Sequence, residues 1–448
     1  MMPKTALRMT IHKKWSFNMN KSVRLFYRST LSLAIFAVAT SSYAEVTQEQ
    51  IAKLQQQIQE LQTRFDKQNE DKKVVAMSTS SSDLKRLVTK GGAEFELYGN
   101  IRADASYQIK GPSAMYNNIS TVPLKHTEAE THNADKFQST LNATRFGFNF
   151  TAPSTWDHKV GGKLEMDFFG GAGRDTFRLR HAYITFDDWL IGQTWSNFNA
   201  IEYFPETVDA ALSVGGSLTR VSQIKYSYPV DSHLNFAVSL EDPKSETVTT
   251  TGTQNFKTDA NAKLKLPSAT GRINYKFDNG SALSGRVFLT QKATSAGDHN
   301  EFIAWGAALG GKWQVTPNTL IRADYNHIKG DTKNLLWSNY AYVFDGNGHI
   351  KPNEFDTVTV GLTQKITPKI RSSVGLGYMR ANNSNSFSEL VHNDSTQNKE
   401  LIEGWINAFY TPVKAINIGF EYMYGQRTTF NDQEGIDNRI NATIIYDF

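Results

Sequence analysis

Arginine side chains recur in this chain opposite apolar side chains, in segments where polar and apolar residues alternate. Alternation assigns one set of arginines to the polar side: Arg102, Arg145, Arg272, Arg286, Arg322, Arg371 and Arg439. It assigns four lysines to the same side: Lys163, Lys225, Lys276 and Lys312. Guanidinium groups stay charged and grip a carboxylate through two parallel hydrogen bonds. A series of modest sites of this kind suits the passage of small carboxylates from one site to the next.

Two further arginines are ambiguous. Arg178 and Arg180 share the alternation of Ala182, Ile184 and Phe186, which would put them on the apolar side. Either a β-bulge intervenes or the two side chains lie at the rim of the sheet. Acidic residues also fall on the polar side: Asp104, Glu165, Asp167, Asp324 and Glu421. An alternative is therefore a balanced interior, in which the arginines pair with acids and only set the local field.

The elements that position these side chains are β-strands. In the last stretch, 438–448, every second residue back from Phe448 is apolar and most of the others are polar. Side chains of a strand alternate between its two faces, so one face is apolar and the other polar. An outer-membrane barrel needs such an apolar row toward lipid and a last strand that closes onto the first. A charge in mid-strand on the lipid face would cost about 2 to 4 kcal/mol, which favours inward arginines.

The connections between the predicted strands sort by length. Seven tight connections carry turn residues, at 152–158, 187–189, 229–233, 277–281, 315–319, 366–369 and 411–414. Eight others alternate with them, near 110–137, 170–175, 196–219, 243–261, 292–299, 330–353, 383–398 and 428–435. Most of these are longer and polar. The pattern predicts an all-β fold, a 16-stranded antiparallel transmembrane β-barrel with both chain ends on the tight-turn side. A soluble β-sandwich has no reason to sort its connections in this way.

One long connection is unusually apolar. The segment 197–219 includes Phe198, Tyr203, Phe204, Pro205 and Val208, a composition unsuited to a solvated outer loop. Folded into the barrel, it would narrow the water-filled channel that a barrel of this size leaves. We predict a constriction loop there, with Tyr203 and Pro205 on the wall and Glu202, Glu206 and Asp209 facing water. The alternative is an outer loop that packs on a neighbouring subunit.

The front of the chain is a targeting segment. A basic stretch, an apolar run too short to span a bilayer and Ser42-Tyr43-Ala44 predict a signal peptide, residues 1–44, with Met1 or Met19 as the start. This segment holds seven of the 48 basic residues and no acidic ones. Its removal leaves 41 basic against 44 acidic residues, a formal charge of about −3. The net charge therefore gives no support to nucleic-acid binding.

Residues 45–71 are predicted to form a periplasmic coiled coil. Ile51, Leu54, Ile58, Leu61 and Phe65 recur at heptad a and d spacing. Fewer than three heptads are barely stable alone, so the helix implies an assembly that is also joined elsewhere. An alternative is a lone amphipathic helix. Residues 72–93, rich in serine and ending near Gly91-Gly92, are predicted to be a linker before the barrel at 94–448.

Several kinds of chemistry lack support in the sequence. There is no cysteine, which excludes disulfides, thiolate metal sites and thiol nucleophiles. No zinc spacing or phosphate-binding glycine loop is present, so we expect no metal and no cofactor. Scattered serines and histidines fix no hydrolytic triad, and we expect no enzyme.

Several motifs together resemble a known family. They are Glu96-Leu97-Tyr98-Gly99-Asn100, Thr144-Arg145-Phe146-Gly147-Phe148, 165–170, 192–198 and 205–209. With the heptad segment and the terminal Phe448, they are similar to DcaP-type porins, dicarboxylate-specific channels with an N-terminal coiled coil. These motifs are frequent in the predicted coil and in the first third of the predicted barrel. The later strands resemble the family mainly in their alternation of polar and apolar residues.

The resemblance implies a homotrimer in the bacterial outer membrane, in contact with lipid and lipopolysaccharide, that takes up small dianions such as aliphatic dicarboxylates and phthalate-like acids. A general or phosphate-type diffusion porin is the alternative within this class. A structural barrel whose coil contacts the periplasm or cell wall is the alternative outside it. The residues expected to line the pore and meet the solute are Arg102, Arg145, Arg178, Arg180, Arg272, Arg286, Arg322, Arg371, Arg439 and Lys225.

Overall fold

The computed structural model describes residues 86–153, 157–170, 175–243, 263–294, 300–336 and 339–448, with Gln56, Gln59 and Glu60. The chain divides into two units, 1–77 and 78–448, which are described separately. Of the predicted coiled coil, only those three residues are described, and they are helical. The rest of the predicted coil and the predicted signal peptide lie outside the described residues.

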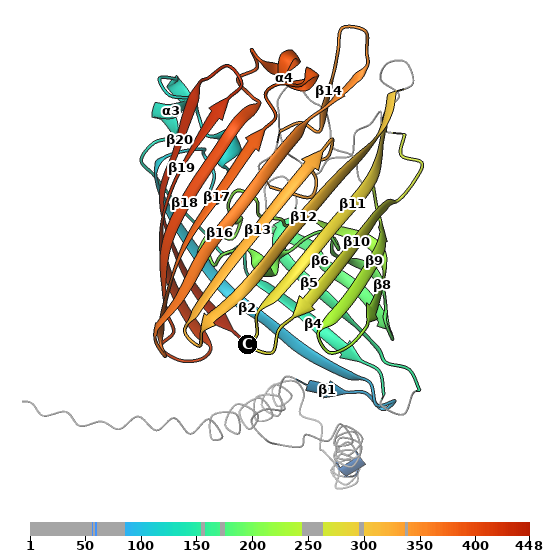
Figure 1. The fold of residues 1–448 in the computed structure, drawn as a ribbon. Coiled ribbons are helices and arrows are strands. Elements are labelled where there is room, and N and C mark those ends of the chain that lie inside the picture. The colour runs from blue at the N-terminus through green and yellow to red at the C-terminus, as the bar shows by residue number, and fades with distance from the viewer. Residues whose placement is uncertain are drawn as a thin grey trace, which may run out of the picture. The chain divides into compact units, whose positions relative to one another are not determined.

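The second unit is a closed antiparallel barrel (Figure 1). Its wall consists of β2 (Glu94–Lys110), β3 (Lys136–Thr140) and β4 (Arg145–Thr151), β5 (Val160–Gly170), β6 (Thr176–Phe186), β7 (Trp189–Trp195), β8 (Arg220–Pro229), β9 (Leu234–Glu241), β10 (Ser268–Lys276), β11 (Ala282–Thr294), β12 (Asn300–Thr316), β13 (Thr319–Lys329), β16 (Glu354–Thr367), β17 (Ile370–Ala381), β18 (Asn398–Tyr410), β19 (Ile416–Thr429) and β20 (Glu434–Asp447). Both β3 and β4 pair with β2 and act as one interrupted strand. The wall thus has sixteen strands, as the alternation predicts.

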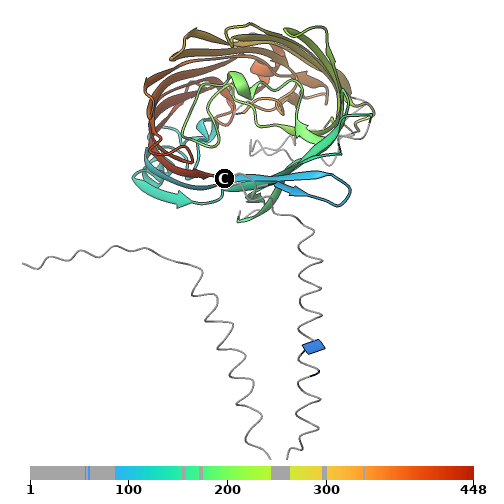
Figure 2. The same cartoon turned by 90° about the horizontal axis from the view of Figure 1, so that it is seen from below.

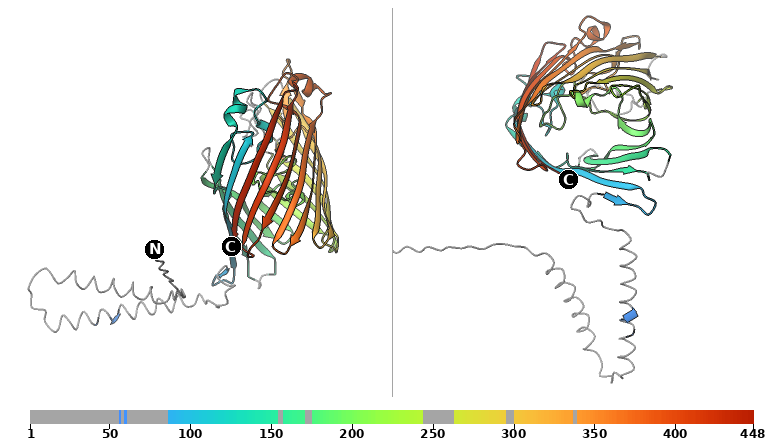
Figure 3. Two further views of the ribbon diagram at one scale, coloured as in Figure 1. Left: turned by 90° about the vertical axis from the view of Figure 1, so that its left-hand side faces the viewer. Right: turned by 60° about the horizontal axis from the view of Figure 1, so that its bottom comes forward.

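Closure joins the last strand to the first. β20 pairs with β2, with Asp447 opposite Asn100 and Ile444 opposite Ala103. Phe448 adds two backbone hydrogen bonds to Gly99, one in each direction. Closure leaves no free sheet edge, which a hydrocarbon environment requires because it cannot hydrogen-bond an exposed backbone. The C-terminus lies at the barrel end that carries the short turns (Figure 3).

The last part of the predicted linker, 72–93, contains a strand. Arg86–Val88 forms a strand, β1, that pairs with β2 through Leu87 and Phe95. Gly92, with φ of 81°, lies in the turn between them, where a left-handed backbone favours glycine. The prediction of linker through residue 93 is therefore wrong for its last part, because the hairpin begins before the wall does.

The opposite end of the barrel carries the longer connections. They include the helices η2 (Ile119–Thr121), α3 (Glu128–Asn133) and α4 (Ser386–Val391) and the hairpin β14 (Tyr342–Phe344) and β15 (Ile350–Pro352). In the hairpin turn, backbone N–H groups of His349 and Asn347 donate to the Asp345 carboxylate and lower its pKa to about 2. Among the described residues, no helix has the length and apolarity needed to cross a bilayer.

Apolar side chains cover the outside of the wall. Leu309, Ile406, Phe420 and Val287 are each more than half exposed, which a wall facing hydrocarbon requires. Polar side chains on the other face are mostly buried, including Asp104, Glu165, Asp324 and Glu421. The polar contents of the barrel therefore pack against each other and against the connections that fold inward.

Adjacent positions on β8 test which face meets lipid. Ile224 is about half exposed on the outside, whereas Lys225 points inward. We predict that Ile224→Arg lowers the free energy of unfolding by about 2 to 4 kcal/mol, because the charge enters hydrocarbon. Urea unfolding in lipid vesicles measures this free energy, with the folded fraction read from the heat-dependent electrophoretic mobility of the barrel. The control Lys225→Arg keeps a charge on the inner face and should unfold like the wild type. Equal unfolding of both variants would contradict the assignment.

Candidate functional site: the barrel interior

The connection between β7 and β8 folds across the interior of the barrel (Figure 2). It contains the short helix η3, Ile201–Tyr203. Its apolar side chains are buried: Phe198 lies edge-on to Phe288 of β11, and Phe204 stacks on Trp405 of β18 with ring centres 5.6 Å apart. These contacts account for the apolar composition of the segment, which we call the β7–β8 loop (residues 196–219).

Glu421 of β19 anchors the middle of this loop. Its carboxylate accepts hydrogen bonds from the Thr207 hydroxyl at 2.8 Å and from the backbone N–H groups of Val208 and Asp209 at 2.8 and 3.2 Å. The Trp405 indole N–H and the Asn407 amide both donate to the carbonyl of Glu206. The loop backbone is thereby fixed to β18 and β19.

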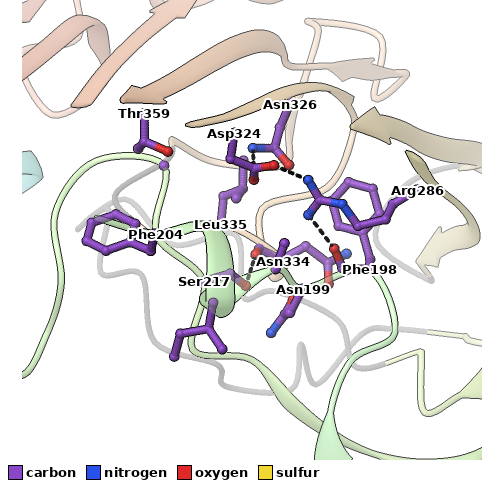
Figure 4. A pocket seen from close by; sticks show the side chains of 14 residues that line it. Phe198, Asn199, Phe204, Ser217, Arg286, Asp324, Asn326, Asn334, Leu335 and Thr359 are labelled. Carbon is purple, nitrogen blue, oxygen red and sulfur yellow. Dashed lines mark hydrogen bonds and ion pairs between the residues drawn. The ribbon is translucent and has the colours of Figure 1, made fainter. Parts of the chain in front are cut away.

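Two predicted pore arginines hold the start of the loop. Arg272 donates to the carbonyl of Asn199 at 2.8 Å and forms an ion pair with Glu202. Arg286 donates to the carbonyl of Phe198 at 2.9 Å and pairs with Asp324 (Figure 4). Arg286 is only 3% exposed, because the loop covers it. Its guanidinium stabilises the loop and does not reach open water.

Other predicted arginines are matched with carboxylates. Arg102 binds Asp104 and also donates to the carbonyl of Val208. Arg371 pairs with Glu206 at 2.9 Å, and its guanidinium lies over the Phe409 ring.

Arg439 is fully buried between acids. It pairs with Asp437 at 3.2 Å and with Asp209 at 3.5 Å. Asp209 is only 4% exposed, so the expectation that it faces water is wrong. It also accepts the backbone N–H of Asn117, which brings the β2–β3 connection onto the loop. The two other loop acids, Glu202 and Glu206, are partly exposed and carry arginine partners.

A β-bulge explains Arg178 and Arg180. The register of β5 against β6 pairs Glu165 with His181 but Met166 with Leu179, so Arg180 has no partner across the ladder. The extra residue shifts the alternation of β6 and turns both arginines inward. Arg178 binds both oxygens of Asp167, at 3.0 and 2.6 Å, and Arg180 bridges Glu165 and Asp167.

Of the ten residues expected to meet the solute, three carry no carboxylate partner in the part of the chain that the structure describes. They are Arg145, Lys225 and Arg322, of which Arg322 has one weak hydrogen bond to the Thr363 hydroxyl at 3.3 Å. The Nε atom of Arg145 is buried without a hydrogen-bond partner. Burial of a charged donor without a partner is costly, so a bound anion would stabilise Arg145.

Alternation misses Arg220, an additional arginine that has no carboxylate partner among the residues described. It is the first residue of β8 and shares the alternation of Ser222 and Ile224, which face outward. Its guanidinium lies 4.6 Å from the centre of the Trp195 ring, and its Nη1 atom has no hydrogen-bond partner. The sequence signal that could have indicated an inward Arg220 is its position directly after an apolar loop that folds into the barrel.

Arg145 and Arg220 line the same cavity, of about 750 Å³. Arg102, Arg178 and Arg180 contribute further guanidinium groups to its wall. The loop side is formed by Thr207, Asp209, Ala210 and Leu212. We call this space the upper cavity. It holds two guanidinium groups that have no carboxylate partner among the described residues, one of them against the Trp195 ring, and such groups suit a small carboxylate.

Residues 31–448 match the family described as DcaP outer membrane protein. The chain belongs to this family. The crystal structure of the outer membrane channel DcaP of Acinetobacter baumannii is similar, with 34% identity and a TM-score of 0.73 over 82% of this chain and all of that one. The protein is therefore an outer-membrane channel.

More distant structures share the fold. An anion-selective porin from Comamonas acidovorans has 10% identity and a TM-score of 0.54 over 80% of this chain and all of that one. Salmonella typhi OmpF in complex with daunomycin has 13% identity and a TM-score of 0.51 over 81% of this chain and 99% of that one. No curated protein sequence matches the chain significantly. For this DcaP family member, the distant porins support the barrel architecture alone.

The Glu421 anchor predicts how the loop responds to substitution. In Glu421→Ala, three loop donors lose their acceptor, which should lower the free energy of unfolding by about 1 to 3 kcal/mol and make the open-channel current noisy. Thermal unfolding and single-channel recording measure the two effects. Glu421→Gln retains one acceptor oxygen and should lie between the wild type and the alanine variant. A stable alanine variant with a quiet current would show that other contacts hold the loop.

Proposed function

We propose that this channel is a passive, solute-selective porin for small carboxylates, with dicarboxylates and phthalate-like acids as its solutes. The supporting observation is the pair of unpaired guanidinium groups, Arg145 and Arg220, on one cavity beside the loop. A carboxylate in the upper cavity would give these two guanidinium groups the anionic partner that no described residue gives them.

Charge pairing sorts the remaining arginines by role. Arg272, Arg286 and Arg439 hold the loop and are already compensated by Glu202, Asp324, Asp437 and Asp209. A solute would have to displace a carboxylate in order to bind them. Arg178 and Arg180 are compensated by Glu165 and Asp167, so they set the field of the cavity. Selectivity therefore depends on the few uncompensated cations.

Passage of a solute follows from these positions. A dianion entering from the end with the long connections would meet Arg145 and Arg220 with one carboxylate. The Trp195 ring lies against the guanidinium of Arg220 and so holds this cation beside the cavity. Release requires that the binding be modest, and the hydrated cavity of about 750 Å³ keeps the solute in contact with water. No bond is made or broken, and we propose no enzymatic activity.

Neutralising the two unpaired arginines tests the proposal. In Arg145→Gln/Arg220→Gln, the block of chloride current by added succinate or phthalate should weaken about tenfold, because charged hydrogen bonds to the solute are lost. Planar-bilayer recording measures the block, together with the reversal potential in a salt gradient. The homotrimer that the family resemblance implies should appear as conductance steps in groups of three.

A control that removes one positive charge far from the cavity is Lys414→Gln, on an exposed turn between β18 and β19. It should leave the block unchanged. A wild-type reversal potential that favours cations, with no carboxylate effect, would contradict the proposal and favour a general diffusion porin. Folded protein that does not conduct would favour a structural barrel.

A further inference from the structure

Three cations form a row across neighbouring strands, below the β7–β8 loop. Lys276 of β10 lies opposite Ala282 of β11, which lies opposite Lys312 of β12. Lys312 in turn lies directly opposite Arg322 of β13. We call Lys276, Lys312 and Arg322 the cation row.

The row faces the inside of the barrel. The residues that precede or follow its members point outward and are exposed: Tyr275, Trp313 and Ile321. Alternation along each strand therefore turns Lys276, Lys312 and Arg322 inward. Lys312 and Arg322 are partly buried there.

Contacts of the loop locate the row. Tyr203 of the loop packs with Ala282, the residue between Lys276 and Lys312. Pro205 lies against Gly361, which is the partner of Arg322 in β16. The loop segment from Tyr203 to Pro205 thus runs along the row. The row lies on the side toward the short turns, since Lys312 is near the β12–β13 turn at 316–319.

The row carries uncompensated charge. Within the described ranges, Lys276 and Lys312 have no ion pair, and Arg322 donates only to Thr363. The loop acids Glu202 and Glu206 are occupied: Glu202 pairs with Arg272, and Glu206 pairs with Arg371. Glu206 also acts on Arg322 electrostatically, without a direct ion pair. Like charges directly opposite each other on neighbouring strands destabilise a sheet, so the Lys312–Arg322 pair has a cost that a bound anion would offset.

We propose that the cation row is a second anion subsite, which takes a small carboxylate dianion on the short-turn side of the loop. This inference rests on the proposed function of the channel. The upper cavity binds the solute on one side of the loop, and the row binds it on the other. Two modest sites in series permit a dianion to pass the narrow region with one carboxylate held at each step.

Sided block measurements test the subsite. The variant Lys312→Gln/Arg322→Gln is recorded in planar bilayers with succinate added to one side at a time. Block from the short-turn side should weaken about threefold or more, and block from the opposite side should persist. In Arg145→Gln/Arg220→Gln, block by succinate from the side opposite the short turns should weaken, and block from the short-turn side should persist. The charge-retaining variant Lys312→Arg/Arg322→Lys should show the same block as the wild type. An unchanged heat-dependent electrophoretic mobility verifies that each variant is folded.

The outcomes separate the two proposals. Unchanged block from both sides in Lys312→Gln/Arg322→Gln, with loss in Arg145→Gln/Arg220→Gln, would overturn the subsite and leave the proposed function intact. Absence of block in the wild type from either side would overturn the proposed function and the subsite with it.

Discussion

A guanidinium group held inside a protein needs either a carboxylate or a set of hydrogen-bond acceptors, because it does not lose its charge. In this barrel, that requirement fixes the structure of the interior. Arg272 and Arg286 bind backbone carbonyls at the start of the β7–β8 loop, and Arg102 binds one near its middle. These arginines thus hold the loop. Their charges are neutralised by carboxylates of the loop and of the barrel wall.

A few cations have no carboxylate partner among the described residues, and these are the ones available to bind a solute anion. Arg145 and Arg220 share the upper cavity with arginines that are already paired. Lys276, Lys312 and Arg322 lie on the other side of the loop, away from any described carboxylate partner. Among the described residues, positive charge without a carboxylate partner therefore lies on both sides of the loop, although the net charge without the first 44 residues is about −3. Placement, and not total charge, would give it a preference for anions.

The fold could be predicted from the sequence because its signal is local. Alternation from Glu94 onward defines the strand faces, and the lengths of the connections define which end each belongs to. The partners of the arginines could not be predicted, because Arg439 and Asp209 are 230 residues apart along the chain. The inward turn of Arg178 and Arg180 depends on a bulge that only the pairing of β5 with β6 reveals. Arg220 was missed because alternation groups it with Ile224, on the lipid side.

The most direct test of this account is the position of a bound solute in the barrel. A crystal of the protein soaked with bromosuccinate would place bromine by its anomalous scattering. We predict a bromine peak in the upper cavity, with a carboxylate between Arg145 and Arg220. A solute bound instead at the paired arginines, or no bound solute at a concentration that blocks the current, would contradict the claim that unpaired guanidinium groups select the solute.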